Sequence, residues 1–190
     1  MPNSGHHTRR ARWPVPEPLT EPMTLYLLRH AIAAERGTPG YTDDSKRPLT
    51  SKGAKKMKRI AQGMKTLGIE FDLLLSSPYA RARQTAEIVA AVFHTKKKLC
   101  FSEHLTVEGD PVKLIYQLTH KHRSAVNVIL VGHEPYLSSL ASVLLTGQEE
   151  LPLTFKKGGL CKLAVRRLLL AQCATLEWLL TPRVLAAVGE

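Results

Sequence analysis

The chain has 190 residues, of which 44% are hydrophobic and 23% are charged, which is enough to bury the core of one domain. Its formal net charge of +11 favours anionic partners such as phosphates, nucleic acid or an acidic protein face, although a generally basic surface explains the charge equally well. Three cysteines without a C-x-x-C spacing argue against a disulfide framework and a zinc site, and they are typical of a cytoplasmic protein.

The first 22 residues precede any predicted element. The segment RRARWPVPEPLTEP, residues 9–22, is basic and rich in proline, and it lacks the apolar core of a secretory signal. We therefore expect residues 1–22 to be a disordered extension and residues 23–190 to form one domain. No apolar run approaches the roughly 20 residues of a membrane-spanning helix, so no membrane association is expected.

The predicted domain begins with a strand. Residues 24–29, TLYLLR, form a short apolar run with the length of a buried strand. A polar loop follows, and apolar side chains at helical spacing then predict a helix over residues 54–67 that ends at Gly68. FDLLLSS, residues 71–77, predicts a second strand, and Pro78 suits the first turn of the next helix.

The second half continues the alternation of strands and helices. Its predicted elements are a strand at 99–101, a helix capped by Asp110 with the apolar stripe Val112, Ile115 and Leu118, a strand at 127–133, a helix opened by Pro135, and strands at 159–165 and 175–180. Such alternation implies an α/β fold, a three-layer sandwich in which helices cover both faces of a mostly parallel central sheet.

Basic and imidazole side chains follow three of these predicted strands. Arg29 and His30 end the first strand, and Arg81 lies within one helical turn of the second. His133 ends the strand that begins at residue 127. Because ligands bind outside the carboxyl ends of strands in open α/β sheets, we expect these side chains to face one crevice. Guanidinium groups bind phosphate oxygens bidentately and an imidazole can attack phosphorus, so the set predicts a phosphoryl site.

The same residue types predict how that chemistry would work. A histidine nucleophile needs one deprotonated nitrogen, with its other nitrogen held by a hydrogen bond. Nearby arginines lower the imidazole pKa and balance the charge of the phosphoryl group, while a second histidine can donate to an oxygen. None of the four aspartates ends a strand among these groups, so a magnesium-dependent phosphatase is poorly supported and neither a metal nor a cofactor is expected.

Three motifs carry a resemblance to a known family. LLRHA, SSPYARARQTAE and VGHEP, in this order, resemble the signatures of the histidine phosphatase (phosphoglycerate mutase-like) superfamily, and RPLTSKG resembles its SixA-type phosphohistidine phosphatases. The resemblance implies a mostly parallel sheet between helices, and it implies that His30 is the nucleophile of a phosphohistidine intermediate. It also implies that Arg29, Arg81 and His133 form the phosphate pocket.

The segment after the second motif departs from that pattern. SixA-type chains often have LTPxG there, and larger members have a carboxylate acid, whereas this chain has EHLTVEGDP with Val107 at the proline position. Glu103 or Glu108 could donate a proton, and a surface location explains either glutamate equally well. Because a P–N bond breaks readily once its imidazole is protonated, the missing acid favours a phosphohistidine substrate. The motifs enclose no long insertion that could form a lid, which suggests a site open to a phosphorylated protein.

Other functions remain open at this point. Cys161 and Arg167 fit the C-x5-R spacing of cysteine-dependent phosphatases, but alternation around Cys161 predicts a strand and not a phosphate-binding loop. A non-catalytic module that binds phosphate or another anion would use the lysines of the first helix and of residues 96–98. The aromatic content of 6% is low for a single-strand binder, so no nucleic acid partner is expected.

The favoured hypothesis is a cytoplasmic, monomeric, metal-independent phosphatase that acts on phosphohistidine in a protein. A small phosphate monoester, such as a sugar phosphate, is the alternative substrate, because the predicted pocket recognises only the phosphoryl group.

Overall fold

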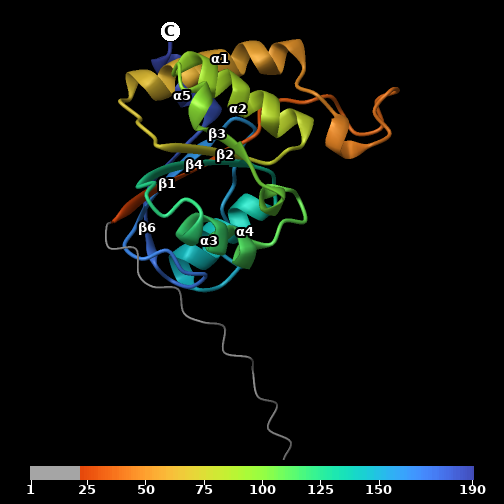
Figure 1. The fold of residues 1–190 in the computed structure, drawn as a ribbon. Helices are drawn as coiled ribbons and strands as arrows, with labels where there is room; N and C mark the ends of the chain where they lie inside the picture. The colour runs from red at the N-terminus through yellow and green to blue at the C-terminus, as the bar shows by residue number, and fades with distance from the viewer. Residues whose placement is uncertain (1–21) are drawn as a thin grey trace, which may run out of the picture.

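The computed structural model describes residues 22–190, and within them a six-stranded sheet has the order β3-β2-β4-β1-β5-β6 (Figure 1). The strands are β1 (Met23–Arg29), β2 (Leu73–Ser76), β3 (Leu99–Phe101), β4 (Asn127–Gly132), β5 (Leu160–Val165) and β6 (Ala174–Leu180). The helices are α1 (Ser51–Thr66), α2 (Ala80–Val92), α3 (Pro111–His120), α4 (Tyr136–Thr146) and α5 (Pro182–Val188). Short 3-10 helices are η1 (Asp44–Lys46), η2 (Lys96–Lys98) and η3 (Glu103–Leu105). The predicted disordered extension lies outside the described residues, apart from Pro22.

The sheet is mixed but mostly parallel. β1 pairs in parallel with β4, and β2 pairs in parallel with β3 and β4. β5 runs antiparallel between β1 and β6. Helices α1, α2 and α5 cover one face of the sheet, and α3 and α4 cover the other (Figure 1). The predicted three-layer α/β sandwich is therefore confirmed.

The central strand β1 is buried on both faces. Leu25 and Leu27 pack in the core cluster that includes residues of α3 and α4, whereas Leu28 packs with residues of α1 and α2. All three side chains are fully buried, and each contributes about 1.5–3 kcal/mol of hydrophobic stabilisation. His30 N–H then donates to the Gly132 carbonyl (3.0 Å). This packing fixes where the chain leaves the sheet and where the side chains beyond β1 point.

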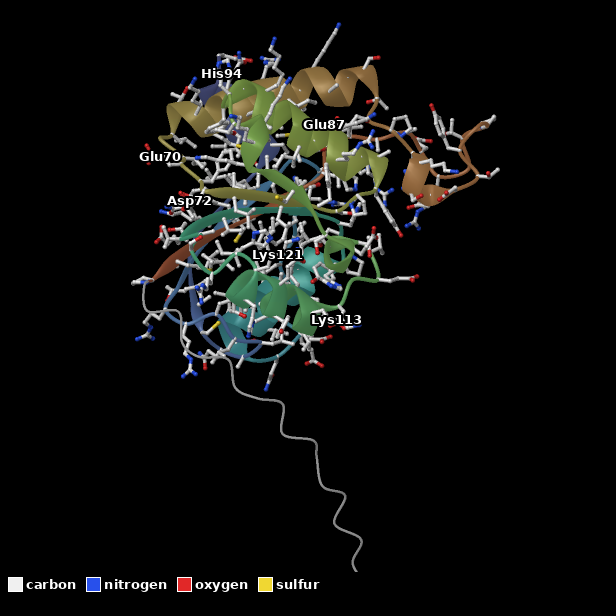
Figure 2. All side chains as sticks on the ribbon, in the orientation of Figure 1. Glu70, Asp72, Glu87, His94, Lys113 and Lys121 are labelled. Atoms are coloured by element: carbon white, nitrogen blue, oxygen red, sulfur yellow. The ribbon has the colours of Figure 1, made fainter. Side chains whose placement is uncertain are left out.

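The two ends of the sheet have different roles. The amino ends carry acidic residues, with Glu70 and Asp72 preceding β2 (Figure 2). The Asp72 carboxylate accepts hydrogen bonds from the backbone N–H groups of Val126 and Asn127 (3.1 and 2.9 Å), which joins the starts of β2 and β4. The loop over residues 31–50 extends from the opposite end, where β1 finishes (Figure 1). The carboxyl ends are thus left for the functional groups.

Some local predictions are confirmed and others are wrong. Asp110 caps α3, accepting from two backbone N–H groups. The buried stripe of α3 is Leu114, Ile115 and Leu118, whereas Val112 is 47% exposed. The cap places Val112 in the first turn, on the solvent side, so the predicted stripe was wrong at that position. Pro78 lies before the helix, since α2 begins at Ala80.

Helix α5 was not predicted from the sequence. It is short, and within it only Pro182 and Leu185 are buried, so its apolar periodicity is weak. The helix packs against α1 at Gly63, where an added Cβ would lie 1.8 Å from the Leu185 carbonyl oxygen. No helix within residues 22–190 has both the length and the apolar character needed to cross a membrane.

Candidate active site

The structure brings the four predicted site residues together at the carboxyl ends of the strands. The His30 and His133 rings have centroids 5.1 Å apart, and Arg81 Nε lies 3.3 Å from His30 Nε2. Arg29 pairs in the sheet with Gly132, the residue before His133. β1, β4 and the first turn of α2 therefore converge as expected for an open α/β sheet.

The two nitrogens of His30 have different roles in this arrangement. Nδ1 lies 2.7 Å from the Ala31 carbonyl oxygen, and a carbonyl can only accept, so Nδ1 carries the proton and donates. Nε2 lies 3.3 Å from Arg81 Nε, which can only donate, so Nε2 presents its lone pair. In this tautomer Nε2 is the unprotonated nitrogen, whose lone pair is directed to Arg81.

The surroundings of His30 favour its neutral form. The side chain is only 6% exposed. Burial lowers the pKa of His30 to about 3, and the charges of Arg81, Arg29 and Lys157 act in the same direction. A histidine with such a pKa is deprotonated at neutral pH, which is the state that can attack phosphorus.

Arg81 is held by Asp44, a residue that the sequence interpretation did not assign to the site. Arg81 Nη1 donates to the Asp44 carbonyl oxygen (2.7 Å), and Arg81 Nη2 pairs with the Asp44 carboxylate (2.9 Å). The carboxylate also pairs with Arg47 (2.8 Å) and Arg36 (3.3 Å). Although burial raises it, these three arginines together hold the pKa of Asp44 below its ordinary value. Asp44 is thus an anion that orients the Arg81 guanidinium beside His30 Nε2.

Within residues 22–190 no aspartate ends a strand beside these groups, but Asp44 contacts Arg81 from the loop after β1. Asp44 lies in η1 of that loop. The loop has no apolar periodicity from which its course could be predicted. The spacing of Asp44 from Arg47, three residues on, was the only signal in the sequence. The described residues contain no group of three His, Cys, Asp or Glu side chains arranged to hold a metal ion.

Thr85 connects the nucleophile segment to α2. Its Oγ1 accepts a hydrogen bond from Ala31 N–H (3.0 Å) and donates to the Arg81 carbonyl (2.7 Å). The side chain is fully buried. The Thr85 hydroxyl therefore fixes Ala31 relative to Arg81. This contact gives a structural reason for the threonine in the QTAE part of the second motif.

His133 is fixed by the second motif as well. Its Nε2 lies 2.9 Å from Ser77 Oγ, and its ring lies 5.2 Å from the Tyr79 ring. The Arg81 guanidinium lies over the same Tyr79 ring, 5.2 Å from its centroid. Ser77 contacts His133 and Tyr79 contacts both His133 and Arg81, and the sequence predicted a role for neither Ser77 nor Tyr79.

Two nitrogens at this site have no hydrogen-bond partner among the described residues. They are Arg29 Nε and His133 Nδ1, and both are buried. Arg29 Nη1 is engaged by the Phe155 carbonyl (2.5 Å), so the guanidinium is anchored while Nε stays free. Because buried polar groups are nearly always paired in folded proteins, these nitrogens indicate a place for an anionic ligand.

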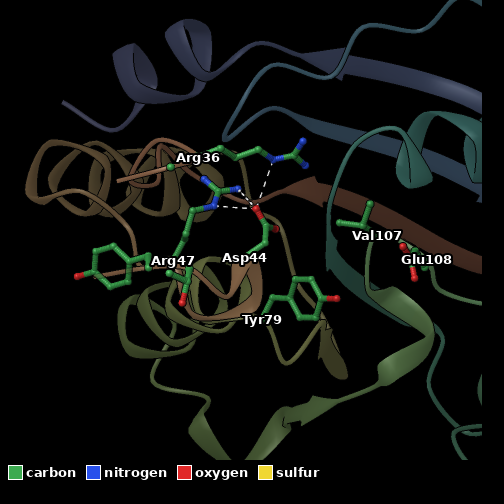
Figure 3. Close-up of a pocket in the computed structure, with 9 residues that line it drawn as sticks. Arg36, Asp44, Arg47, Tyr79, Val107 and Glu108 are labelled. Carbon is green, nitrogen blue, oxygen red and sulfur yellow. Dashed lines mark hydrogen bonds and ion pairs between the residues drawn. The ribbon is translucent and has the colours of Figure 1, made fainter. Parts of the chain in front are cut away.

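A cavity of about 390 Å³ adjoins the cluster and is lined by Asp44, Arg47, Tyr79, Val107 and Glu108, among others (Figure 3). Asp44 and Arg47 lie on one side of Tyr79, and Val107 and Glu108 lie on the other (Figure 3). The cavity therefore has a charged side next to Arg81 and an opposite side that includes Val107.

Three glutamates are placed near the site. Glu108 lines the cavity beside Tyr79, whereas Glu103 lines a separate surface cavity with Lys46 and Arg83. Glu134, which follows His133, was not considered from the sequence. Burial raises the pKa of Glu134, and its carboxylate accepts from Ser138 N–H (3.2 Å). Of the two predicted proton donors, only Glu108 faces the cavity next to Asp44.

The cysteine-phosphatase alternative is wrong on structural grounds. Cys161 lies within β5 and is fully buried. Burial raises the pKa of Cys161 to about 12, so its thiol is protonated at neutral pH and cannot act as a nucleophile.

Comparison with known proteins agrees with this geometry. The sequence profile of the histidine phosphatase superfamily (branch 1) matches residues 25–103. An uncharacterized protein of Picosynechococcus sp. is 38% identical over 139 residues, which cover 73% of this chain and 82% of that protein. The phosphohistidine phosphatase SixA of Escherichia coli is 29% identical over 128 residues, covering 66% of this chain and 76% of SixA.

Solved structures give the same result. The structure of the protein histidine phosphatase SixA complexed with tungstate superposes with a TM-score of 0.72 at 25% identity, covering 85% of this chain and 98% of that one. The motifs, the fold and the relatives coincide, and the chain belongs to the histidine phosphatase superfamily as a SixA-type protein.

Proposed function

We propose that this phosphatase forms a phosphohistidine intermediate on His30 Nε2 and hydrolyses phosphohistidine in a partner protein. The observation that carries the proposal is the state of His30, a buried neutral imidazole whose Nδ1 is held by the Ala31 carbonyl and whose Nε2 lone pair faces Arg81. The unpartnered nitrogens of Arg29 and His133 support a phosphoryl group beside it.

In the first step, the Nε2 lone pair attacks phosphorus and a P–N bond forms as the bond to the substrate nitrogen breaks. The electron pair of the broken bond stays on the substrate imidazole, which takes up one proton and leaves as a neutral ring. Arg81 and Arg29 balance the charge of the phosphoryl oxygens, and the free Nδ1 of His133 donates to one of them. The Ala31 carbonyl stabilises the His30 imidazolium character that develops during attack.

In the second step, a water molecule attacks the phosphorus of phospho-His30 on the face opposite to Nε2. The P–N bond breaks, inorganic phosphate leaves, and His30 returns to its neutral form with the proton still on Nδ1. The arginines supply the positive charge for both steps, the neutral His133 supplies a hydrogen-bond donor, and neither step requires a metal ion.

Of Glu103 and Glu108, the two predicted proton donors, only Glu108 borders the cavity next to Asp44. Glu108 borders the cavity on the side opposite to Arg47, so a substrate whose phosphoryl group sits at His30 would extend past it. Glu103 lines a different cavity. We assign the donor role to Glu108, and expect it to matter less for phosphohistidine, whose imidazole is a good leaving group, than for an alkyl phosphate.

The preference for phosphohistidine is supported by the similarity to Escherichia coli phosphohistidine phosphatase SixA. We further propose that the enzyme acts as a monomer in the cytoplasm, where sparse unpaired cysteines are usual. Its three cysteines are free.

A direct test compares kcat/KM on a phosphohistidine peptide with that on serine phosphate and sugar phosphate esters. We expect the phosphohistidine peptide to be preferred, and Glu108→Gln to reduce hydrolysis of the esters more than that of the peptide. Equal or better hydrolysis of the esters by the wild-type enzyme would contradict the proposed substrate. His30→Ala serves as the inactive control.

A further inference from the structure

A second cavity, of about 270 Å³, lies next to the one that adjoins the catalytic cluster. Val107 lines both cavities. The second one is lined mainly by apolar side chains from the α3 and α4 regions, which include Pro111, Tyr136, Leu140 and Val143. Its volume is just below the roughly 300–1,000 Å³ of sites for drug-sized ligands, and so it suits a single side chain.

The position of this cavity relative to His133 is fixed by α4. Leu137 N–H donates to the His133 carbonyl (2.9 Å), which closes residues 133–137 into a turn at the start of α4. Tyr136 lies within this turn and lines the cavity. The apolar cavity therefore begins at a residue that follows His133 by three positions, and it shares Val107 with the cavity beside Asp44.

Tyr136, which lines this cavity, has a hydroxyl without a hydrogen-bond partner among the described residues. Tyr136 is only 7% exposed. Burial raises the pKa of Tyr136, so the group stays a protonated donor. A buried hydroxyl without a partner is destabilising compared with phenylalanine at the same position, and an acceptor supplied by a ligand removes this cost.

Resting on the proposed function, we propose that this cavity binds an apolar side chain of the substrate protein close to its phosphohistidine. The Tyr136 hydroxyl donates to a backbone carbonyl of the same segment. Val107 forms the boundary between the two subsites, so the phosphoryl group is bound on the arginine side while the neighbouring side chain is bound on the α3 and α4 side. The enzyme thus selects a sequence context in addition to the phosphoryl group.

The test uses phosphohistidine peptides with a serine background and one leucine, placed in turn at each of the three positions on either side of the phosphohistidine. We expect leucine in at least one position to raise kcat/KM about tenfold or more over the all-serine peptide, the gain that burial of a leucine side chain provides. If all peptides are hydrolysed at the same rate, the apolar subsite does not exist and the proposed function still stands. If none is hydrolysed while a small phosphate ester is, the proposed function fails, and the subsite fails with it.

Two variants test whether the leucine side chain binds in this cavity. Ser139→Phe fills the cavity from α4 and should abolish the leucine preference, while kcat/KM for a small aryl phosphate changes less than about twofold. Tyr136→Phe should keep the preference but lower kcat/KM for every peptide by about tenfold, the effect of one lost hydrogen bond, without loss of stability. Val112→Phe, at an exposed position of α3 outside the cavity, is the matched control and should behave as wild type. Retention of the leucine preference by folded Ser139→Phe would overturn the assignment.

Discussion

At the scale of single residues, the site depends on one carboxylate that touches no predicted reacting atom. Asp44 binds Arg81 through its carboxylate and through its backbone carbonyl, and Arg81 in turn lies beside His30 Nε2. The arginine is thereby held in one orientation before substrate arrives, which lowers the reorganisation that the reaction requires. We therefore propose that Asp44 positions Arg81 for the phosphoryl group.

Asp44→Asn removes the negative charge and keeps the backbone contact to Arg81. We expect kcat to fall about 10–100-fold, because hydrogen bonds to charged groups are worth about 1.5–3 kcal/mol, with a smaller change in KM. Steady-state kinetics on a small phosphate ester measures the effect. Asp43→Asn is the control, since Asp43 pairs with Lys46 on the surface. Equal kinetics for the two variants would contradict the role given to Asp44.

Thr85 provides a second prediction at this scale. Thr85→Val keeps the shape of the side chain but removes the hydroxyl that joins Ala31 to Arg81. Because both backbone partners stay buried, the free energy of unfolding should fall by about 1–3 kcal/mol, as measured by urea denaturation, and kcat should fall with it. Thr85→Ser keeps the hydroxyl and should restore most of the lost kcat. If the serine variant is as impaired as the valine variant, the hydrogen bonds are not the cause.

At the scale of secondary-structure elements, α1 and α5 approach closely at Gly63, where the chain has no side chain. Gly63→Ala has an intrinsic advantage of about 1 kcal/mol, because alanine favours helices more than glycine does. The added Cβ would, however, lie 1.8 Å from the Leu185 carbonyl oxygen, and a backbone atom cannot move away cheaply. We expect the clash to dominate and to lower the free energy of unfolding by about 1–3 kcal/mol.

The matched control for this prediction is Gln62→Ala, an exposed neighbour on the same helix, which should be neutral or slightly stabilising. Circular dichroism during urea denaturation measures both variants. A Gly63→Ala variant that is more stable than wild type would show that α5 is not fixed against α1 as the structure has it.

The elements show which parts of the fold the sequence could predict. Strands such as β1 were predictable because a strand buried on both faces needs an almost continuous apolar run, and Arg29 and His30 follow it directly. Asp44 was not predictable in the same way. It reaches Arg81, 37 residues later in the chain, through a loop whose path depends on tertiary contacts. Val112 was wrongly predicted to be buried. The cap at Asp110 sets where α3 begins and so which of its faces is buried, and the apolar character of valine does not.

At the scale of the whole molecule, two buried neutral histidines couple stability to pH. Burial lowers the pKa of His30 and of His133 to about 3, while in the unfolded chain each titrates near 6.5. Between these pH values the unfolded state binds more protons than the folded state. The contribution of the two histidines to the free energy of unfolding is therefore fully present above about pH 6.5 and is lost as the pH falls toward 3. Each histidine contributes a loss of up to about 1.4 kcal/mol per pH unit.

The prediction is a fall in the free energy of unfolding of the wild-type protein as the pH drops below about 6.5. His30→Asn removes one of the two titrating groups, so its stability should depend less steeply on pH over the same range. Urea denaturation at several pH values between 4 and 7.5 measures both slopes. Parallel slopes for the two proteins would mean that His30 is not held neutral in the folded state.

The proposed mechanism requires His30 Nε2 to carry the phosphoryl group during turnover. The most direct measurement is rapid quenching of the enzyme during hydrolysis of a ³²P-labelled phosphohistidine peptide, followed by peptide mapping of the labelled protein. We predict an acid-labile, alkali-stable label on the peptide that contains His30, absent from His30→Ala and slower to form in Asp44→Asn. Label on another residue, or a His30→Ala variant that turns over substrate at the wild-type rate, would contradict this mechanism.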